Sequence, residues 1–259
     1  MIDVTRTLRS AALAAGVTRA AGAALRRTKP GGAGLWERKN HAGRTVDLCP
    51  GPAAALGVAA GALAAEPGTR GAALLATLAA GACGAYDDVA GEGDPRRGFR
   101  AHLTALRDGE LTSGAVKLFG ISAAGLAAGA LLKERPVDRM LAGVVVAGTA
   151  HFLNLVDVRP GRAAQAALVI GAPGLLRGPL AAAPLAAAAA VLPDDLGERG
   201  MLGDTGAHAL GAALGVAIVA GNGRAGLAAH AAGLVAATVC GDRVSAFVKD
   251  TAPGAESPV

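Results

Sequence analysis

The sequence GMLGDTGAHALG at residues 200–211 places an aspartate, Asp204, directly before an apolar run that extends over 204–222. Two other stretches also join acidic residues to the end of an apolar run, GAYDDVAG at 84–91 and FLNLVDVRPGR at 152–162. We refer to these three stretches as the acidic motifs. A long apolar run that ends in carboxylates is typical of a helix that leaves a membrane at a functional site.

The composition also favours a membrane protein. Hydrophobic residues make up 52% of the chain and charged residues 17%, and the mean hydropathy is +0.42, which is high for an ordinary soluble domain. The apolar residues are mostly Ala, Gly, Leu and Val, and aromatic residues contribute only 2%, so small side chains must provide close helix packing. The alternative class is a soluble, Ala-rich helical protein with buried helices.

Stretches with few charges predict about nine membrane spans. Several are shorter than the ~20 residues that cross a bilayer, so we expect the helices to extend into their polar flanks. The first contains Arg19 and has no convincing cleavage site, which favours a retained helix over a secretory signal. The sequence predicts an all-α, polytopic integral membrane helical bundle, with one transmembrane domain over 1–245 and a flexible tail over 246–259. The expected spans are 10–26, 50–65, 71–86, 117–132, 140–156, 163–176, 179–192, 204–222 and 225–241.

Basic residues predict the orientation of the bundle. With nine spans and the amino terminus outside, one side holds about 16 Lys and Arg and the other about eight, and the richer side is expected to be cytoplasmic. All three acidic motifs fall on that side. The sequence pI near 9.6 then reflects loops that meet an anionic leaflet and anionic substrates. Nucleic-acid binding is excluded as an explanation, because no basic surface interleaved with aromatic residues and no known binding fold is present.

Two further features are minor. The cysteines Cys49, Cys83 and Cys240 have no metal-like spacing and are expected to be free thiols in a reducing compartment. The segment RRGFRAHLTALRDGEL at 96–111 has the pattern of a short amphipathic helix on the membrane surface.

The chemistry of the acidic motifs starts with Asp87, Asp88 and Asp204. Adjacent carboxylates near lipid need a cation, a basic partner or water, because even low estimates put one central charge at ~2.5–3.5 kcal/mol. Asp204 can occupy a helix amino terminus, where backbone N–H groups suit a phosphate and a carboxylate suits a bridging magnesium ion. The alternatives are that Asp87 and Asp88 only mark the water boundary and that Asp204 only caps its helix.

The second acidic motif offers a contact set for a nucleotide or phosphate. Asn154 and Asp157 are three residues apart and share a helix face, and Arg159 and Arg162 follow them. An amide, a carboxylate and two guanidinium groups suit such a ligand, although a polar helix end with snorkelling arginines has the same pattern. Lys117, at the start of another span, either binds a phosphate or snorkels to the membrane surface.

The order and context of these motifs resemble the polyprenyl-phosphate N-acetylhexosamine-1-phosphate transferases, the glycosyltransferase family that includes phospho-N-acetylmuramoyl-pentapeptide transferase. The resemblance covers roughly residues 30–245. Its strongest part is MLGDTGAHALGAALG at 201–215, followed by the Asp87-Asp88 pair and by Asn154-Leu-Val-Asp157. It implies a multi-pass enzyme of the bacterial plasma membrane that uses Mg²⁺ to transfer a sugar 1-phosphate from a UDP-sugar to a polyprenyl phosphate, releasing UMP, in cell-envelope glycan synthesis.

The resemblance also implies residue roles. Asp204 would bind the metal with help from Asp88, and Asp87 and Asp88 would act on the lipid phosphate. Ala and Gly helix faces further allow a homodimer. The expected catalytic residues are Asp87, Asp88 and Asp204, and the expected substrate contacts are Lys117, Asn154, Asp157, Arg159 and Arg162.

The sequence also departs from the family pattern. Val89, Ala90 and Gly91 follow the aspartate pair, where a third charged residue is usual, His151 replaces a common asparagine, and the late histidine motif is missing. These departures support an alternative, a catalytically inactive descendant that binds polyprenyl phosphate or a wall-assembly partner.

Overall fold

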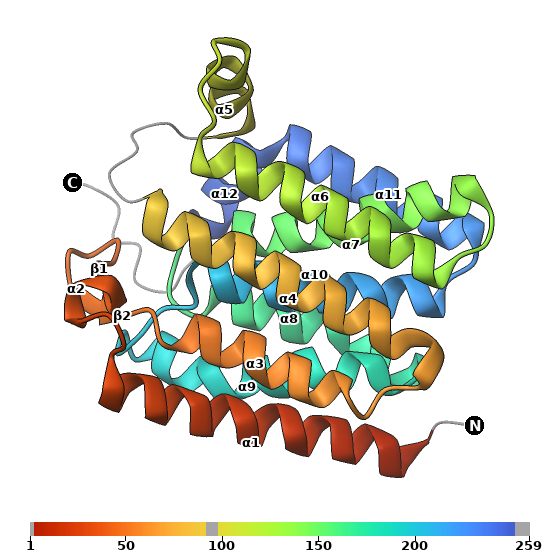
Figure 1. Cartoon of the computed structure of the whole chain (residues 1–259), viewed down its shortest axis with the longest axis horizontal. Coiled ribbons are helices and arrows are strands. Elements are labelled where there is room, and N and C mark those ends of the chain that lie inside the picture. Colours follow the sequence, from red (N-terminus) through yellow and green to blue (C-terminus); the bar gives the residue numbers. More distant parts are fainter. Residues whose placement is uncertain (1–2, 92–97, 252–259) are drawn as a thin grey trace.

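The structure is a computed structural model that describes residues 3–91 and 98–251, and most of these residues are helical. The helices lie side by side in a bundle, and successive long helices run in opposite directions (Figure 1). The helices are α1 (Val4–Thr28), α2 (Ala33–Trp36), α3 (Pro50–Ala62), α4 (Pro67–Ala90), α5 (Gly98–Arg107), α6 (Ser113–Leu132), α7 (Pro136–Val156), α8 (Arg162–Gly171), α9 (Ala182–Leu196), α10 (Gly203–Gly221), α11 (Arg224–Val239) and α12 (Gly241–Asp250).

Two short strands and two 3₁₀ helices complete the described elements. The strands β1 (Glu37–Lys39) and β2 (Thr45–Asp47) form an antiparallel hairpin in which Arg38 pairs with Val46. The 3₁₀ helices η1 (Ala172–Arg177) and η2 (Pro179–Ala181) connect α8 to α9.

Helix α10 lies in the centre of the bundle and packs against α4, α7 and α3. Most of its side chains are buried, among them Leu210, Leu214 and Val216. Gly211 and Gly215 let α7 approach closely, because an added Cβ would stand 2.5 Å from the Ala150 Cα and 2.6 Å from the Val146 Cα. Glycines spaced by four residues are a common means of close packing between membrane helices.

The alternation of the helices brings the acidic motifs to one end of the bundle, which we call the site end. Helices α4 and α7 end there, and α6 and α10 begin there, beside the hairpin and α2 (Figure 1). The hairpin is joined to the start of α10 by a bridge between Asp47 and Gly200 and by a 2.8 Å hydrogen bond from the Met201 N–H to the Asp47 carbonyl. The opposite end carries the turns between α6 and α7 and between α10 and α11.

The prediction of an all-α bundle is confirmed, but the predicted count of about nine spans is not supported. Among the described residues, four helical segments are long and apolar enough to cross a membrane, or up to five if the bent pair α11–α12 counts as one span. Counting charge-free stretches gave too many spans, because some of the helices are too short to cross a bilayer. Helix α3 has only 13 residues and α8 only 10. The four segments are Ser113–Leu132, Pro136–Val156, Pro179–Leu196 and Gly203–Gly221.

Three smaller expectations can be compared with the structure. The segment 163–176 is not one helix, because α8 gives way to η1 at Ala172, one residue before Pro173. The amphipathic helix expected within 96–111 corresponds to α5, although 96–97 lie outside the described residues. The first part of the tail expected over 246–259 is helical, since α12 continues to Asp250, and 252–259 lie outside the described residues.

Candidate functional site

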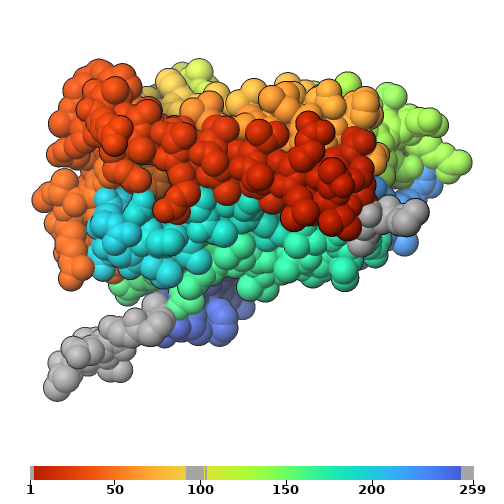
Figure 2. Space-filling view, turned by 90° about the horizontal axis from the view of Figure 1, so that it is seen from below, coloured from red at the N-terminus to blue at the C-terminus, as the bar shows by residue number. Residues whose placement is uncertain are grey.

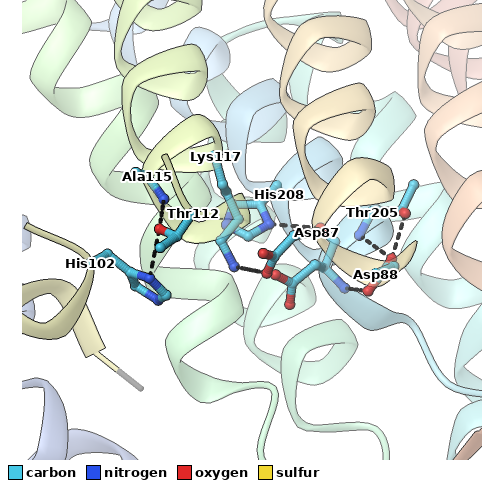
Figure 3. Close-up of polar contacts among 9 residues, drawn as sticks. Asp87, Asp88, His102, Thr112, Ala115, Lys117, Thr205 and His208 are labelled. Carbon is cyan, nitrogen blue, oxygen red and sulfur yellow. Dashed lines mark hydrogen bonds and ion pairs between the residues drawn. The ribbon is translucent and has the colours of Figure 1, made fainter. Parts of the chain in front are cut away.

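Three segments that are distant in sequence bring charged side chains together at the site end. The last turns of α4 supply Asp87, the first turns of α6 supply Lys117, and the first turn of α10 supplies Asp204. The Lys117 ammonium donates a 2.6 Å hydrogen bond to Asp87 Oδ2 and also contacts Asp204 Oδ2 (Figure 3). These side chains are only 18%, 19% and 23% exposed for Lys117, Asp87 and Asp204. The group is thus a largely buried cation between two carboxylates.

Asp88 has a different role from its neighbour, because its carboxylate caps α10. Asp88 Oδ1 accepts a 2.9 Å hydrogen bond from the Asp204 N–H, and Oδ2 accepts from the Thr205 N–H at 3.0 Å and from its hydroxyl at 2.6 Å (Figure 3). Leu202, the residue at the N-cap position of α10, offers no side-chain oxygen. A carboxylate from another helix therefore satisfies the free N–H groups and the positive end of the helix dipole.

Two local features fix this cap. Gly203 has a φ of +60°, and an added Cβ there would stand 3.1 Å from Asp88 Oδ1, so glycine serves both the backbone conformation and the close approach. Arg38 of the hairpin donates a 2.8 Å hydrogen bond to the backbone carbonyl of Asp88. The hairpin thereby holds the end of α4 against the start of α10.

The capping role changes which residues suit a magnesium ion. Both Asp88 oxygens already accept hydrogen bonds, whereas Asp87 and Asp204 direct their carboxylates to one point, where Lys117 supplies the positive charge. Within the described ranges, no group of three or more His, Cys, Asp and Glu side chains is placed to hold a metal ion. Mg²⁺ usually takes only one or two carboxylates together with water and substrate phosphates. Asp87 and Asp204 fit that donor set better than the expected pair of Asp204 and Asp88.

His208 lies directly behind Asp204. It is 1% exposed, and its Nδ1 lies 2.7 Å from the Asp204 carbonyl oxygen. Because a carbonyl only accepts hydrogen bonds, Nδ1 carries the proton. This contact with the preceding turn holds the first turn of α10, which carries Asp204. The sequence marks His208 only as a polar residue in an apolar run, so this supporting role was missed.

The second acidic motif lies at the same end but forms a separate group. Asp157 follows the last residue of α7, and with Arg159 it lines a cavity of about 170 Å³. Burial, and then the negative charges of Asp195, Asp204 and Asp88, raise the pKa of the Asp157 carboxyl well above its usual range. Asp157 therefore shares an electrostatic environment with the first group.

Two buried polar atoms without partners belong to residues that line this cavity. Arg159 Nε and Asp195 Oδ2 are buried and accept or donate no hydrogen bond within the described protein, and Asp195 is only 3% exposed. Both residues line the cavity. Buried polar groups are normally hydrogen-bonded, so these two point to water or a ligand in the cavity.

The structure does not gather all the residues expected of this motif. Arg162 begins α8 and donates a 2.8 Å hydrogen bond to the Thr251 carbonyl, beside the end of α12. Neither Arg162 nor Asn154 lines the cavity. The residues that replace them come from the hairpin, from the end of α9 and from the loop before α10, and they include Lys39, Asn40, His41, Asp195 and Glu198.

Sequence reasoning missed these cavity residues for an identifiable reason. The segment ERKNHAGRTVD at 37–47 is visibly polar, but nothing in it indicates that it folds back onto the loop before α10. The contact depends on tertiary hydrogen bonds, such as the 2.6 Å bond from Asn40 Nδ2 to Glu198 Oε2. The polar composition makes this segment a candidate for a binding site, but it does not show which part of the chain the segment contacts.

No protein-family model matches the chain, and no curated protein is similar enough to it to count as a relative. The functional argument therefore depends on the geometry of the site and on the sequence motifs.

Proposed function

We propose that this protein is a magnesium-dependent membrane transferase that moves a sugar 1-phosphate from a UDP-sugar to a polyprenyl phosphate and releases UMP. The observation that carries the proposal is the convergence of Asp87, Lys117 and Asp204 from three helices at one end of an apolar bundle. Paired carboxylates with a lysine suit the recognition of phosphate groups through a metal ion. The proposal places this end at the cytoplasmic face of a bacterial plasma membrane, as the excess of basic residues predicts.

In the proposed reaction, an oxygen of the lipid phosphate attacks the phosphorus bonded to the sugar. The bond from that phosphorus to the bridging oxygen breaks, and UMP leaves with the oxygen. A phosphate monoester is largely ionised near neutral pH, so the protein need not supply a strong base. Its residues instead position the two phosphate groups and offset their negative charge.

Asp87 and Asp204 are the residues that would hold Mg²⁺. The bound ion supplies charge neutralisation for the diphosphate. Lys117 lies between the two carboxylates and can donate to a phosphate oxygen when a metal ion takes over its present partners. Asp88 acts indirectly, because its capping of α10 fixes the backbone from which Asp204 projects.

The neighbouring cavity is the proposed site of the nucleotide. The unpartnered Nε of Arg159 offers a hydrogen-bond donor, and the unpartnered Oδ2 of Asp195 offers an acceptor or, when protonated, a donor. Donors and acceptors in one cavity suit the edge of a base or a ribose. Lys39 from the hairpin adds a positive charge at the cavity wall.

One observation favours a second candidate, the non-catalytic protein that binds polyprenyl phosphate or a wall-assembly partner. Lys117 already pairs with both carboxylates, as an internal cation would in a protein that no longer uses a metal. In that case the lipid phosphate would bind at the site end without any sugar transfer.

The two candidates are separated by an assay on the purified full-length protein. It is incubated with undecaprenyl phosphate and a panel of UDP-sugars, and UMP release is measured with Mg²⁺ and with a chelator. Metal-dependent UMP release from at least one donor supports the transferase. Absence of release from every donor, together with retained binding of undecaprenyl phosphate, supports the second candidate and overturns the first.

A further inference from the structure

A groove with a volume of about 590 Å³ lies between α11 and η1, and residues of α7 and α10 also line it. Most of the side chains in the groove are apolar, among them Phe152, Leu214, Ile218 and Leu234. Helices α7 and α10 are both long and apolar enough to cross a membrane. The groove therefore lies at the depth of the hydrocarbon core.

The groove begins at the opposite end of the bundle and extends about as far as one leaflet. Gly221 and Asn222 line its outer limit at the α10–α11 turn. Figure 2 shows this turn, in light blue at the right, at the end of the molecule away from the hairpin. On α11 the lining continues to Ala237, 13 residues after the helix begins at Arg224, which is roughly 20 Å of helix. Half of a bilayer with its headgroups measures about 20–22 Å.

The outer limit of the groove carries a positive charge without a counter-ion. Arg177 lines the groove and is exposed. Its guanidinium donates a 2.7 Å hydrogen bond to the Gly221 carbonyl but forms no ion pair with any residue of the described ranges. Thr149 and Asn222, by contrast, donate at 2.7 and 2.8 Å to carbonyls of their own helices. Arg177 is thus the group at this limit that can still pair with an anion.

The small side chains of the α11 wall allow two kinds of occupant. Ala229, Gly233 and Ala237 follow each other at intervals of four residues, and all three line the groove. Such spacing also suits close packing of another helix, so a second copy of the chain is the alternative to a lipid. In a two-fold dimer, however, the same patch meets itself, and none of the described residues that line the groove is acidic. The charge of Arg177 therefore favours an anionic ligand.

We propose that this groove binds a phospholipid with an anionic headgroup, from the leaflet at the opposite end of the bundle. One acyl chain lies along α10, between α11 and η1, where it contacts Leu214, Ile218 and Leu234. The phosphodiester accepts hydrogen bonds from Arg177, as anionic groups at the membrane interface do from arginines near helix ends. Burial of the chain provides most of the affinity, and Arg177 selects the charge.

The site is independent of the proposed catalytic function. Asp204 and Gly221 lie at the two ends of α10 and are 17 residues apart, or roughly 25 Å of helix. A phosphate beside Arg177 is therefore in the other leaflet from the carboxylate and lysine group. Failure of the transferase assay would leave this site unaffected, and the reverse also holds.

The test measures lipid binding to the purified full-length protein by native mass spectrometry from neutral detergent. Dioleoyl phosphatidylglycerol and dioleoyl phosphatidylcholine are titrated separately, because they share their acyl chains and differ in headgroup charge. We expect the wild type to bind phosphatidylglycerol about five- to tenfold more tightly than phosphatidylcholine, since one arginine near the membrane surface contributes about this factor.

The first variant, Gly233→Leu, fills the groove. A Cβ added to Gly233 meets nothing within 4 Å, and leucine has the better helix propensity, so the variant should fold, as its Tm will check. It should weaken the binding of both lipids by at least about tenfold, because its side chain occupies space that the acyl chain needs. Gly16→Leu is the matched control and should keep wild-type binding, since Gly16 is a glycine of α1 with equally open surroundings and does not line the groove.

The second variant, Arg177→Gln, tests the headgroup. It should bind phosphatidylglycerol no more tightly than phosphatidylcholine, while Arg139→Gln keeps the wild-type preference. Arg139 is the matched control, because it is another exposed arginine at the opposite end and donates a 2.8 Å hydrogen bond to a carbonyl, that of Lys133. It does not line the groove.

Four results would overturn the proposal. Equal phosphatidylglycerol affinities in Gly233→Leu and Gly16→Leu would remove the acyl chain from the groove. Equal lipid preferences in Arg177→Gln and Arg139→Gln would remove the headgroup from Arg177. A wild-type dimer that Gly233→Leu converts to a monomer in the same spectra would assign the groove to a second copy of the chain. Displacement of phosphatidylglycerol by an equal concentration of inorganic phosphate would show that the ligand is a free anion.

Discussion

Two neighbouring regions of the site end differ in how far the protein satisfies its own polar groups. Around Asp87, Asp88, Lys117 and Asp204, every carboxylate has a donor within the protein. Around the cavity beside Asp157, buried atoms of Arg159 and Asp195 have no partner. The first region is therefore organised before any ligand arrives, and the second retains polar groups that a ligand can satisfy.

This difference has a physical consequence for substitutions. In the first region, each side chain that is removed leaves a buried partner without compensation, so stability should fall. In the second region, removing a buried charge that lacks a partner relieves a desolvation cost, so stability should rise while ligand binding falls. Proteins commonly accept such a cost at functional sites.

The largest effect is expected from Lys117→Met. It leaves Asp87 and Asp204 as neighbouring buried carboxylates with no cation, and it should lower the free energy of unfolding by about 3–5 kcal/mol. Reversible unfolding in mixed micelles measures the change. Lys133→Met is the matched control, because Lys133 only donates a 2.9 Å hydrogen bond to the Asn222 carbonyl at the opposite end, and it should cost about 1 kcal/mol. Equal losses in the two variants would contradict the account.

A smaller loss is expected from Asp88→Ala. This change removes three hydrogen bonds to the start of α10 and should lower the free energy of unfolding by about 2 kcal/mol. Asp3→Ala tests an exposed cap of the same kind, since Asp3 accepts from the Arg6 N–H at 2.9 Å, and it should cost less than Asp88→Ala because solvent surrounds this cap. A loss in Asp88→Ala no larger than that in Asp3→Ala would remove the capping role.

Asp157→Asn is expected to act in the opposite direction. The pKa of Asp157 is raised in the folded protein by burial and by neighbouring carboxylates, so ionisation of this group disfavours the folded state. Its cost is absent below the unfolded pKa of about 3.9, grows as the pH rises, and is complete above the folded pKa.

The stability gained by Asp157→Asn should therefore be small at pH 4 and larger at pH 8, as thermal unfolding at the two values can measure. Asp108→Asn is the control, because Asp108 is exposed and its replacement should change neither value. A gain that is larger at pH 4 than at pH 8 would reverse the assigned sign.

The sequence predicted the location of the first region better than the second. Helix alternation follows from the lengths of the apolar runs, and it is enough to bring Asp87, Lys117 and Asp204 to the same end. The capping role of Asp88 could not be predicted, because it depends on which N–H groups approach the carboxylate. The number of spans was overestimated, since a charge-free run such as 50–65 marks a helix without showing that it crosses a bilayer.

The cavity was the least predictable part. Asp195 belongs to a Pro-Asp-Asp sequence at the end of an apolar run, a pattern that usually marks an exposed helix end. In the structure Asp194 faces two arginines, whereas Asp195 is buried. Successive residues of a helix face different directions, so the rotation of α9 about its axis decides which of the two aspartates is buried. The sequence alone does not set that rotation. Arg162 was expected to contact the substrate because of its charge. In the structure it donates a hydrogen bond to the Thr251 carbonyl, beside the end of α12.

The most direct test of the central claim is UMP release by Asp204→Asn in the presence of Mg²⁺, undecaprenyl phosphate and the best UDP-sugar donor. Asp138→Asn is the control, because Asp138 pairs with Arg224 at 2.6 Å at the opposite end of the bundle. The account predicts a loss of at least about 100-fold for Asp204→Asn and near wild-type turnover for Asp138→Asn. A folded Asp204→Asn variant that turns over as fast as Asp138→Asn would contradict it.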